Sequence, residues 1–370
     1  MSDKEIFLGE IFDIERGGSP RPIQHYLTDD ADGVPWIMIG DTAVGGKYIE
    51  RTRLRIKKEG IRKSREVYPG ELLLTNSMSF GRPYILKTYG CIHDGWLALK
   101  PKRNGIDLDY VYYALGSDHA MAQFQKQAAG ATVKNLNKDI VSSVKIPLPP
   151  LEEQRRIAAI LDRAQDIKAK VSQRSCLLQA LARSLFVRRF GLPSENPRDL
   201  PVYKLVDICN PKQWPTISSK QLLETGYPVF GANGLIGYFD RFNHPDPTVL
   251  VTCRGATCGT VNISPPNCYV TGNSMAMDNP DSGLITTEYL AWVLRLRGMH
   301  DVISGSAQPQ ITRQGLEAVA IPVPPIEAQM DFANELRAVE GIDNSSRLSE
   351  GSLSDVSKCL GEQLIGGNRA

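Results

Sequence analysis

The sequence Ile-Pro-Leu-Pro-Pro-Leu-Glu-Glu-Gln at residues 146–154 returns 175 residues later as Ile-Pro-Val-Pro-Pro-Ile-Glu-Ala-Gln at residues 321–329. The same offset matches Leu161 with Leu336. Solenoid repeats are much shorter than this, about 20–50 residues. The chain is therefore predicted to contain two similar globular units, each of which leads through a proline-rich hinge into a helix.

The segments before the two hinges also follow one order. The matching pairs are residues 8–11 and 205–208, 72–75 and 249–252, 91–95 and 268–272, and 109–115 and 288–294. In the first copy, strands are expected at Pro35–Ile39, Leu72–Thr75, Tyr84–Lys87 and Trp96–Lys100, and a helix from Asp109 to about Gln127. The whole domain is thus predicted to be duplicated.

A long helix is predicted between the two domains. Residues 151–190 contain neither glycine nor proline, and Gly191 and Pro193 follow them. Alternating steps of three and four select positions 157, 160, 164, 167, 171, 174, 178, 181 and 185, which are all apolar except Arg174. This spacing is typical of a coiled-coil seam. A helix of this length would extend about 60 Å, at about 1.5 Å per residue.

The second helix has a weaker pattern, because Gly341 and Gly351 interrupt it. Each glycine costs about 1 kcal/mol relative to alanine inside a helix. We expect either two pieces or a helix that is stabilised by packing on the first. The predicted fold class is α+β: two similar mixed α/β domains separated by two long helices packed as an antiparallel coiled coil. The expected boundaries are 1–148 for the first domain, 149–190 for the first helix, 191–200 for a linker, 201–323 for the second domain and 324–366 for the second helix.

Charge is distributed unevenly along the 370 residues. Residues 1–190 contain 30 Lys or Arg against 22 Asp or Glu, whereas residues 191–370 contain 13 against 19. This asymmetry favours a polyanionic partner for the first half. The sequence contains no apolar run of the ~18–20 residues that cross a bilayer and no signal-peptide core, so we expect a cytoplasmic protein without membrane association.

Catalytic, cofactor and metal motifs are not found in the sequence. The seven cysteines form no Cys-x-x-Cys pair, and the five histidines show no paired spacing, so buried reduced thiols are expected instead of a zinc site. There is no phosphate-binding GxxxxGK[ST] loop and no Glu-x-Lys triplet of metal-dependent nucleases. Ser264–Asn267 resembles a methyltransferase loop but lacks its aromatic fourth residue. We therefore expect no catalytic residues and no cofactor.

Basic residues are concentrated in residues 47–65, which contain nine Lys or Arg and only two acidic residues, Glu50 and Glu59. Alternate side chains of a strand share one face, so Arg51, Arg53 and Arg55 would line up on a strand. Such a face, with Lys57 and Lys58 beside it, could follow a phosphate backbone. A solvated basic surface is the alternative interpretation.

Polar loops recur at equivalent places in both halves. Asn, Gln and Arg side chains can make bidentate contacts to base edges, whereas turns without a ligand are the alternative. The candidate residues are Asn76, Ser77, Ser79 and Arg82 in the first glycine-containing loop, Arg254 and Thr257 in the second, Lys134 and Asn135 before the first hinge, Gln308, Gln310 and Arg313 before the second, and Asn273.

The order of domain, hinge, long helix, domain, hinge and helix resembles the specificity subunit of type I restriction-modification systems. Residues 34–41 and 227–238 also resemble that family's target-recognition domains, and in the second segment Asn233 and Tyr238 join the candidate DNA-binding residues. The resemblance implies a non-catalytic subunit whose two domains each read one part of a split, asymmetric site in double-stranded DNA. It further implies that the helices act as spacers and dock two methyltransferase subunits, through which restriction subunits are added.

This chain departs from the family pattern in its second half. The second hinge reads Glu327-Ala328-Gln329, its helix is interrupted by glycines, and its domain is acidic, so its grip on DNA would depend more on partners. Two different domains on one stiff spacer predict two different half-sites, with centres about one helical turn, ~10 bp, apart. Two alternatives remain open at this stage: a coiled-coil adaptor that never reads bases, and an enzyme with an unrecognised site.

Overall fold

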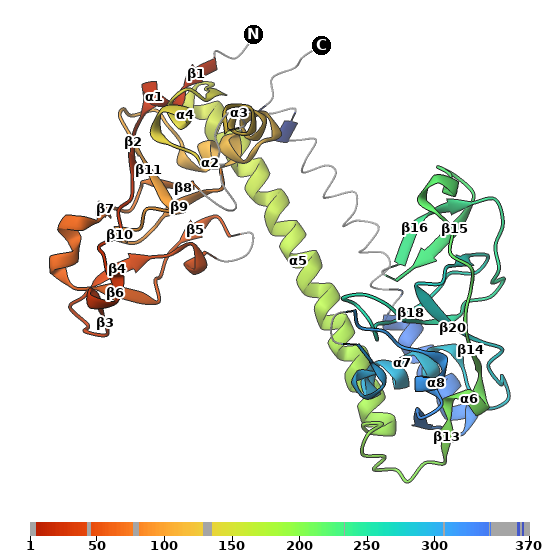
Figure 1. The fold of residues 1–370 in the computed structure, drawn as a ribbon. Helices are drawn as coiled ribbons and strands as arrows, with labels where there is room; N and C mark the ends of the chain where they lie inside the picture. Colours follow the sequence, from red (N-terminus) through yellow and green to blue (C-terminus); the bar gives the residue numbers. More distant parts are fainter. Residues whose placement is uncertain are drawn as a thin grey trace. The chain divides into compact units, whose positions relative to one another are not determined.

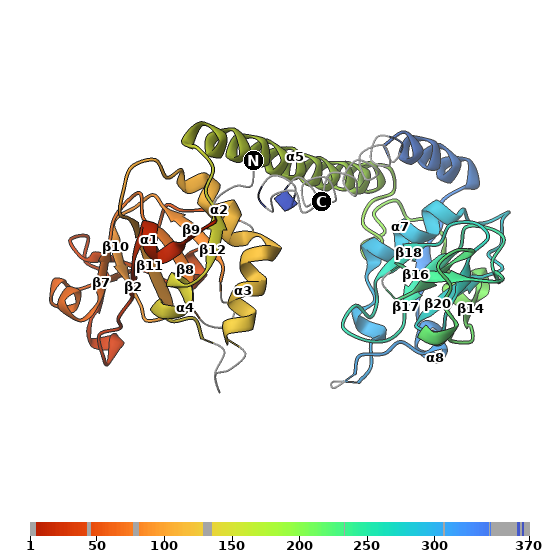
Figure 2. The ribbon, with the colours of Figure 1, turned by 90° about the horizontal axis from the view of Figure 1, so that it is seen from above.

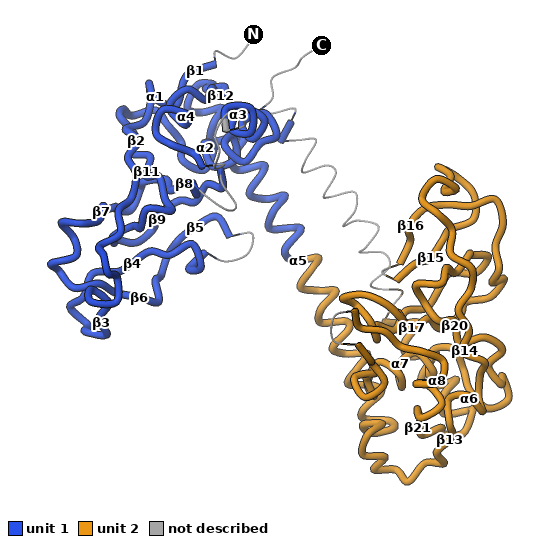
Figure 3. The backbone as a smooth tube through the Cα atoms, viewed as in Figure 1, with its two compact units in different colours: residues 1–170, 349–370 blue, residues 171–348 orange. Residues whose placement is uncertain are grey.

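The computed structural model describes residues 5–42, 46–76, 81–128, 135–232, 234–305, 308–339, 341, 361–362 and 365. The chain divides into two compact units, residues 1–170 with 349–370 and residues 171–348 (Figure 3). A helix of 40 residues, α5 (Leu151–Phe190), begins in the first unit and ends in the second (Figure 1). Its bounds agree with the uninterrupted helix that the sequence predicts.

The first unit contains two mixed sheets and four helices before α5. Its strands are β1 (Glu5–Phe7), β2 (Phe12–Arg16), β3 (Leu27–Thr28), β4 (Val34–Ile37), β5 (Tyr48–Ile49), β6 (Leu54–Ile56), β7 (Arg65–Val67), β8 (Leu72–Thr75), β9 (Pro83–Leu86), β10 (Gly90–Ile92), β11 (Trp96–Pro101) and β12 (Lys145–Pro147). Its helices are α1 (Leu8–Ile11), α2 (Leu108–Gly116), α3 (Asp118–Ala128) and α4 (Lys138–Ser142), with 3-10 turns η1 (Ile23–His25), η2 (Ile39–Asp41) and η3 (Lys58–Lys63). The four predicted strands are confirmed as β4, β8, β9 and β11.

The central sheet of this unit has the order β2-β11-β8-β9-β5, and a second sheet has the order β3-β6-β4-β10-β7. Successive residues of a strand point to opposite faces. Leu72 and Leu74 of β8 pack with α2 and α3, which lie along one side of the sheet (Figure 2). Leu73, between them, packs against Ile37 and Ile92 of the second sheet. The central sheet is therefore covered on both faces, which explains its unbroken apolar strands.

The second unit repeats this architecture with fewer strands. Its strands are β13 (Val202–Lys204), β14 (Asn210–Gln213), β15 (Tyr227–Gly231), β16 (Gly234–Phe239), β17 (Val249–Thr252), β18 (Val261–Ile263), β19 (Tyr269–Val270), β20 (Ser274–Asp278) and β21 (Ala320–Pro322). Its helices are α6 (Leu205–Ile208), α7 (Thr287–Arg297), α8 (Arg313–Leu316) and residues 326–339, with 3-10 turns η4 (Ser219–Gln221) and η5 (His300–Val302).

The two larger sheets of the second unit correspond to those of the first, and the two-stranded sheet β13-β21 corresponds to β1-β12. The order β14-β20-β17-β18 matches β2-β11-β8-β9, and the parallel pair β15 and β19 matches the parallel pair β4 and β10. Val249 and Val251 of β17 pack in the core with α7, whereas Leu250 packs with Cys268 and Val270 towards the second sheet. The duplication predicted from the sequence is therefore present in the strand order and in the packing.

The repeated glutamine of the hinge is a buried clamp in both units. The side chain of Gln154 accepts a hydrogen bond from the Asp107 N–H (2.9 Å) and donates to the carbonyls of Gly105 (3.1 Å) and Pro149 (2.8 Å). Gln329 makes the same three bonds, to the Thr286 N–H (2.9 Å) and to the carbonyls of Leu284 (2.9 Å) and Pro324 (2.8 Å). Each glutamine ties the first turn of its long helix to the start of the domain helix, α2 or α7.

A tyrosine reinforces each hinge from the domain side. The hydroxyl of Tyr110 on α2 donates to the carbonyl of Pro147 (2.9 Å), and that of Tyr289 on α7 donates to the carbonyl of Pro322 (2.8 Å). Burial raises the pKa of Tyr289, so this hydroxyl keeps its proton and remains a donor. The hinges are therefore fixed joints at these points.

Helical residues from the C-terminal part of the chain pack on α5 near both of its ends. In the second unit, Phe186 and Phe190 near the end of α5 pack edge-to-face on Phe332 near the start of the second helix. In the first unit, the helical residue Ile365 lies in the same buried cluster as Ile157 and Leu161 from the start of α5. The order of these contacts, with residue 332 on the end of α5 and residue 365 on its start, agrees with the antiparallel arrangement that the sequence predicts.

The predicted seam is wrong at the C-terminal end of α5. The buried positions there are Ala182, Phe186 and Phe190, whereas Leu181 is 47% exposed. These three residues recur every four positions and face the core of the second domain, so docking on that domain determines the buried face. Gly341 is itself helical, and Gly351 lies outside the described residues.

The single helix predicted from Asp109 to Gln127 is also wrong, because the structure contains α2 and α3 with a break at Ser117. The backbone of Ser117 is extended (φ −72°, ψ 154°), and its hydroxyl accepts a hydrogen bond from the Ala120 N–H. Serine is a favoured residue at a helix start because it satisfies such a free N–H group. Gly116 and Ser117 therefore end one helix and begin the next without disturbing the apolar periodicity.

Four of the six described cysteines are buried: Cys91, Cys209, Cys253 and Cys268. Burial raises the pKa of each of these thiols, which is typical of inert core cysteines. In the part of the chain that the structure describes, no cluster of His, Cys, Asp and Glu is suited to a metal ion. Within the same residues, no helix has the length and apolar character needed to span a bilayer.

Glu71 is a buried carboxyl group at the start of β8, and we predict that it destabilises the first unit at neutral pH. Its side chain is 4% exposed, one carboxyl oxygen has no hydrogen-bond partner among the described residues, and burial raises its pKa. An acid whose pKa is raised in the folded state loses stability as the pH rises from its unfolded pKa through its folded pKa. Glu71→Gln should remove that loss, because the amide carries no charge that burial could disfavour.

Thermal unfolding of both chains between pH 4 and pH 8 measures this effect. The variant should become more stable relative to the natural chain as the pH rises. A pH-independent difference between the two chains would contradict the assignment of a buried carboxylate with one unsatisfied oxygen.

Candidate nucleic-acid interface

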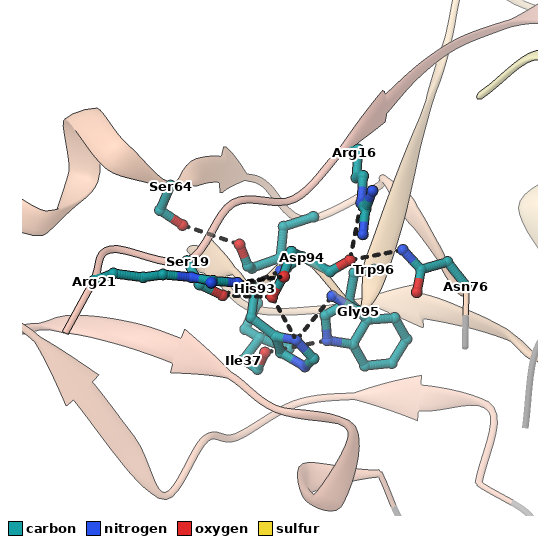
Figure 4. A network of polar contacts seen from close by, with 11 residues as sticks. Arg16, Ser19, Arg21, Ile37, Ser64, Asn76, His93, Asp94, Gly95 and Trp96 are labelled. Carbon is teal, nitrogen blue, oxygen red and sulfur yellow. Dashed lines mark hydrogen bonds and ion pairs between the residues drawn. The ribbon is translucent and has the colours of Figure 1, made fainter. Parts of the chain in front are cut away.

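In the first unit, three loops from the ends of β2, β8 and β10 meet at Asp94 (Figure 4). The backbone carbonyl of Asp94 accepts hydrogen bonds from Arg16 Nε (3.1 Å) and from Asn76 Nδ2 (2.7 Å). Its carboxylate accepts one from the Ser19 hydroxyl (2.6 Å) and lies 3.5 Å from Arg21 Nη2. The Ser19 bond holds the pKa of Asp94 below its usual range. The loops are thus joined around a permanent negative charge.

The residues beneath this cluster form a rigid aromatic base. The imidazole of His93 lies with its centroid 6.3 Å from the rings of both Trp36 and Trp96. Burial lowers the pKa of His93, and its Nδ1 accepts the Gly95 N–H (2.9 Å), so the neutral ring carries its proton on Nε2. A Cβ atom at Gly17 would collide with the carbonyl of His93, so only glycine permits this approach of the two loops.

Basic side chains surround the same cluster. Arg21 projects from the loop after β2, and its side chain is 82% exposed. A Cβ atom on Gly18 would sit 2.9 Å from the carbonyl oxygen of Lys63, so the end of η3 lies directly against this loop. Arg62 and Lys63 of η3 are exposed, and Lys63 Nζ donates to the Tyr26 hydroxyl (2.7 Å). The meeting point of the three loops therefore has a positively charged rim.

The arginine face predicted at residues 51–55 is not formed, because β6 spans only Leu54–Ile56. Arg53 instead donates to the Gly40 carbonyl (3.0 Å) and pairs with Asp41 (3.1 Å). Arg55 donates to the Gly33 carbonyl (2.7 Å). Both guanidinium groups brace neighbouring loops. Arg51, Lys57 and Lys58 are exposed, and the two lysines border a cavity that they share with Asp30, Asp32 and Glu59.

Asn76 and Arg82, in the first glycine-containing loop, take different positions. Asn76 is only 2% exposed, and its backbone carbonyl accepts the N–H of Leu136, which brings the exposed Asn135 next to the cluster. Arg82 is exposed and borders a separate cavity of about 460 Å³ beside Tyr112 and Gln165. Ser77, Ser79 and Lys134 lie outside the described residues.

In the second unit, four segments meet at Cys253, directly after β17. The Cys253 N–H donates to the Asn273 carbonyl (3.1 Å), and its carbonyl accepts the Ile311 N–H (3.0 Å). The next residue, Arg254, pairs with Gln310 in an isolated antiparallel bridge. The Thr252 hydroxyl donates to the Ala232 carbonyl (2.6 Å), which anchors the turn between β15 and β16. These bonds gather exposed Arg254, Asn273, Gln308 and Gln310 at one end of the domain.

The structure places the other predicted residues of this unit on neighbouring elements. Tyr238 lies on β16 opposite Pro228, and Arg313 is the first residue of α8, whose cap is Thr312. Thr257 is exposed in the turn that follows Arg254. Asn233 lies outside the described residues.

The two meeting points have the same backbone plan and different side chains. Arg16 ends β2 and donates to the Asp94 carbonyl; Gln213 ends β14 and donates to the Gly272 carbonyl (3.0 Å). Asn76 and Cys253 occupy the equivalent place after the central strand, and each binds the segment that precedes its hinge. Equivalent scaffolds thus present different chemistry in the two domains.

Arg16, Arg21, Asp94 and Gln213 were not identified from the sequence. Their signal was weak: each lies in a short polar stretch that resembles an ordinary turn. The duplication itself could have located Gln213, since it is the counterpart of Arg16 at a strand end that the second half repeats.

Comparison with known proteins agrees with this duplicated plan. The family model described as "Type I restriction modification DNA specificity domain" matches residues 1–174 and 197–350. The EcoprrI type I restriction enzyme specificity subunit of Escherichia coli is 20% identical over 354 residues, which cover 91% of this chain and 88% of that protein. The MjaVIII specificity subunit of Methanocaldococcus jannaschii is 21% identical over 344 residues, 80% of this chain and 78% of that protein.

Solved structures show the same fold at low sequence identity. The type I restriction-modification S subunit from M. genitalium superposes with a TM-score of 0.64 at 16% identity, and covers 98% of this chain and 96% of that one. A chain from a structure of type I R-M complex assembly gives a TM-score of 0.55, also at 16% identity, with 98% and 97% covered. Because the family model matches one segment over each domain and together these span most of the chain, the protein belongs to the family of type I restriction-modification specificity subunits.

Proposed function

We propose that this protein is the DNA sequence-recognition subunit of a type I restriction-modification complex. Its two domains, residues 1–148 and 201–323, each read one half of a split, asymmetric site in double-stranded DNA. One observation carries this proposal: equivalent strand ends gather polar and basic side chains in both domains, on one backbone plan and with different residues. A shared scaffold with different contacting residues is what two readers of different sequences require.

The side chains divide into two groups by exposure. Asn76, Arg16 and Gln213 donate to backbone carbonyls within their own domain and position the loops. Arg21, Asn135, Arg254, Asn273, Gln308 and Gln310 are exposed at the meeting points and are assigned to contact DNA. The basic rim of the first unit is assigned to phosphates.

The same function defines the partners. The protein is non-catalytic, docks two methyltransferase subunits on its helices and recruits restriction subunits through them, in the cytoplasm. The support for this assembly is the family match, together with the packing of Phe332 and Ile365 on the two ends of α5. Catalysis is assigned to the partner subunits.

The proposal is tested by incubating the assembled methyltransferase complex with random duplex DNA and sequencing the methylated fraction. One bipartite motif with two unlike halves should be enriched. Enrichment of no motif would instead support the adaptor alternative, and methylation by this chain alone would support an enzyme.

Arg21→Ala should weaken DNA binding without destabilising the fold. The Arg21–Asp94 pair is 3.5 Å apart and exposed on the arginine side, and such pairs contribute little to stability, about 0–1 kcal/mol. If the guanidinium contacts a phosphate, its loss should reduce the slope of log K against log salt concentration by about 1, uniformly across sequences. Fluorescence anisotropy of the assembled complex at several salt concentrations measures this slope.

Arg155→Ala is the matched control. Arg155 is an exposed arginine of α5 with a similar carboxylate partner, Glu152 at 3.4 Å, and lies away from the meeting point in the chain. Its removal should leave the slope unchanged. Equal effects of the two substitutions would argue against an interface at Asp94.

A further inference from the structure

The joint between the first domain and α5 is held by a nearly buried lysine. Lys47 Nζ lies 2.7 Å from Asp109 Oδ1 of α2 and 2.6 Å from Asp162 Oδ1 of α5, and its side chain is 11% exposed. The Tyr48 hydroxyl donates to Asp109 (2.8 Å), and the Tyr113 hydroxyl donates to Asp162 (2.6 Å). One ammonium group therefore links two carboxylates that would otherwise repel each other across the joint.

The electrostatics of this joint keep its members in these charge states. Burial alone would raise the pKa of Asp109, but the hydrogen bonds from Lys47 and Tyr48 outweigh it and hold the pKa below its usual range. Burial and the bond to Asp162 raise the pKa of Tyr113, so the hydroxyl stays a donor. Lys47 Nζ also lies 4.8 Å from the centroid of the Tyr113 ring, within the range of a cation–π contact.

The equivalent joint of the second unit has the opposite charge on its helix. Arg337 Nη2 of the second helix donates to Glu288 Oε1 of α7 (3.1 Å), and no third residue is needed between them. Lys47 precedes β5, an edge strand of the first central sheet, whereas the matching sheet of the second unit has four strands in its described part and ends at β18. The cation thus comes from the domain in one joint and from the helix in the other.

The hinge glutamines establish that these positions correspond. Asp162 is eight residues after Gln154, and Arg337 is eight residues after Gln329. Asp109 is two residues after Asp107, whose N–H binds Gln154, and Glu288 is two residues after Thr286, whose N–H binds Gln329. Both joints therefore have an acidic residue on the domain helix, and only the residue on the long helix changes sign.

We propose that the charges at the two joints form a charge code, in which the charges of each recognition domain match those of its own helix and not those of the other. In the first joint, Lys47 is the positioning residue. On α5, the second domain would place Glu288 against Asp162 with no cation between them. On the second helix, the first domain would bring Lys47 beside Arg337. The significance for DNA reading rests on the proposed function, because the angle of a domain on its helix determines where its half-site falls.

The first test compares one substitution in two backgrounds. Asp162→Arg is introduced into the natural full-length chain and into a full-length chimera in which residues 201–323 also replace residues 1–148. In the natural chain it should lower the melting temperature by about 5 °C, because it places a second cation beside Lys47. In the chimera it should raise the melting temperature, because it recreates the pair of Arg337 with Glu288.

A second pair of variants keeps the test decisive if the chimera does not fold. Lys47→Met leaves Asp109 and Asp162 unneutralised, so Asp162→Arg should stabilise this background and destabilise the natural one. Glu152→Arg is the control, since it makes the same change of charge on α5 at a side chain that is 90% exposed. An effect of Asp162→Arg with the same sign in every background would overturn the charge code.

The positioning role is measured with the assembled methyltransferase complex. Duplexes carry the enriched site with its natural spacer or with a spacer one base pair longer or shorter. Lys47→Met should lower the preference for the natural spacer several-fold, and adding Asp162→Arg should restore it. An unchanged preference would overturn the positioning role. If the natural complex enriches no site, the proposed function fails, while the melting temperatures still decide the charge code.

Discussion

A chain in which residues 1–148 are replaced by the first domain of another specificity subunit should direct methylation to a site with one half changed and the other half intact. The reason is structural independence: the contacts at Asp94 in the first unit and at Cys253 in the second are each made within one domain. Each mismatched base pair costs about 1–3 kcal/mol, so a half-site with three changed positions loses on the order of 3–9 kcal/mol of discrimination.

The joint at Gln154 should accept such a graft. The bonds from Gln154 to the domain go to backbone groups, the Asp107 N–H and the Gly105 carbonyl, so the donor's side chains at those places can differ. The graft should retain a cation at the position of Lys47, since Asp162 of α5 pairs with it.

Methylome sequencing of a host that carries the natural chain or the graft measures the outcome. A matched graft of residues 201–323 should change only the other half. A change in both halves, or in neither, would contradict the model of two independent readers.

Replacing either hinge glutamine with leucine should cause a large loss of stability. The side chains of Gln154 and Gln329 are 1% and 0% exposed, and each makes three hydrogen bonds to backbone groups. Leucine fills a similar volume but leaves those groups without partners in a buried place. An unsatisfied buried polar group costs about 1–3 kcal/mol, so three of them cost roughly 3–6 kcal/mol after partial relaxation.

Calorimetry of the full chain should show a fall of about 10 °C in the melting transition of the affected unit. Glu152→Leu makes a comparable change at an exposed position two residues before Gln154 and should have little effect. If Gln154→Leu and Glu152→Leu melt alike, the clamp does not hold the hinge. Because the two glutamines lie in different units, each substitution should lower the melting temperature of its own unit and leave that of the other unit unchanged.

Much of the architecture could be predicted because it depends on local patterns in the sequence. A duplication at one offset is visible in any chain that keeps its hinge residues, and an uninterrupted apolar period over 40 residues has few alternatives to a helix. The central strands Leu72–Thr75 and Val249–Thr252 were recognisable as apolar runs, since both of their faces are buried.

The errors arose where a local pattern has two tertiary solutions. The periodicity from Asp109 to Gln127 continues across Ser117 although the backbone breaks there, because α2 and α3 bury their apolar faces in the same core. Likewise, the seam of α5 shifts by one residue at Ala182, Phe186 and Phe190, because the surface that covers this end is a domain.

The candidate interface shows the same limit for polar residues. Arg53 and Arg55 were expected to share an exposed strand face, but each guanidinium instead donates to a backbone carbonyl of a neighbouring loop. Which of the two happens depends on loops that are distant in the sequence. Asp94 receives bonds from Arg16 and Asn76, which are 78 and 18 residues away. Polarity in the sequence indicates that a residue can form such bonds and does not indicate with which partner.

By itself, then, the sequence determined that this protein has two domains, two hinges and a long connecting helix, because duplication and periodicity are properties of the chain. Only the tertiary structure decided what the repeated glutamine does, which loops meet at Asp94 and Cys253, and that Lys47 and Arg337 supply opposite sides of equivalent joints. The physical reason is that hydrogen bonds and ion pairs depend on distances of about 3 Å between groups that chain order leaves far apart.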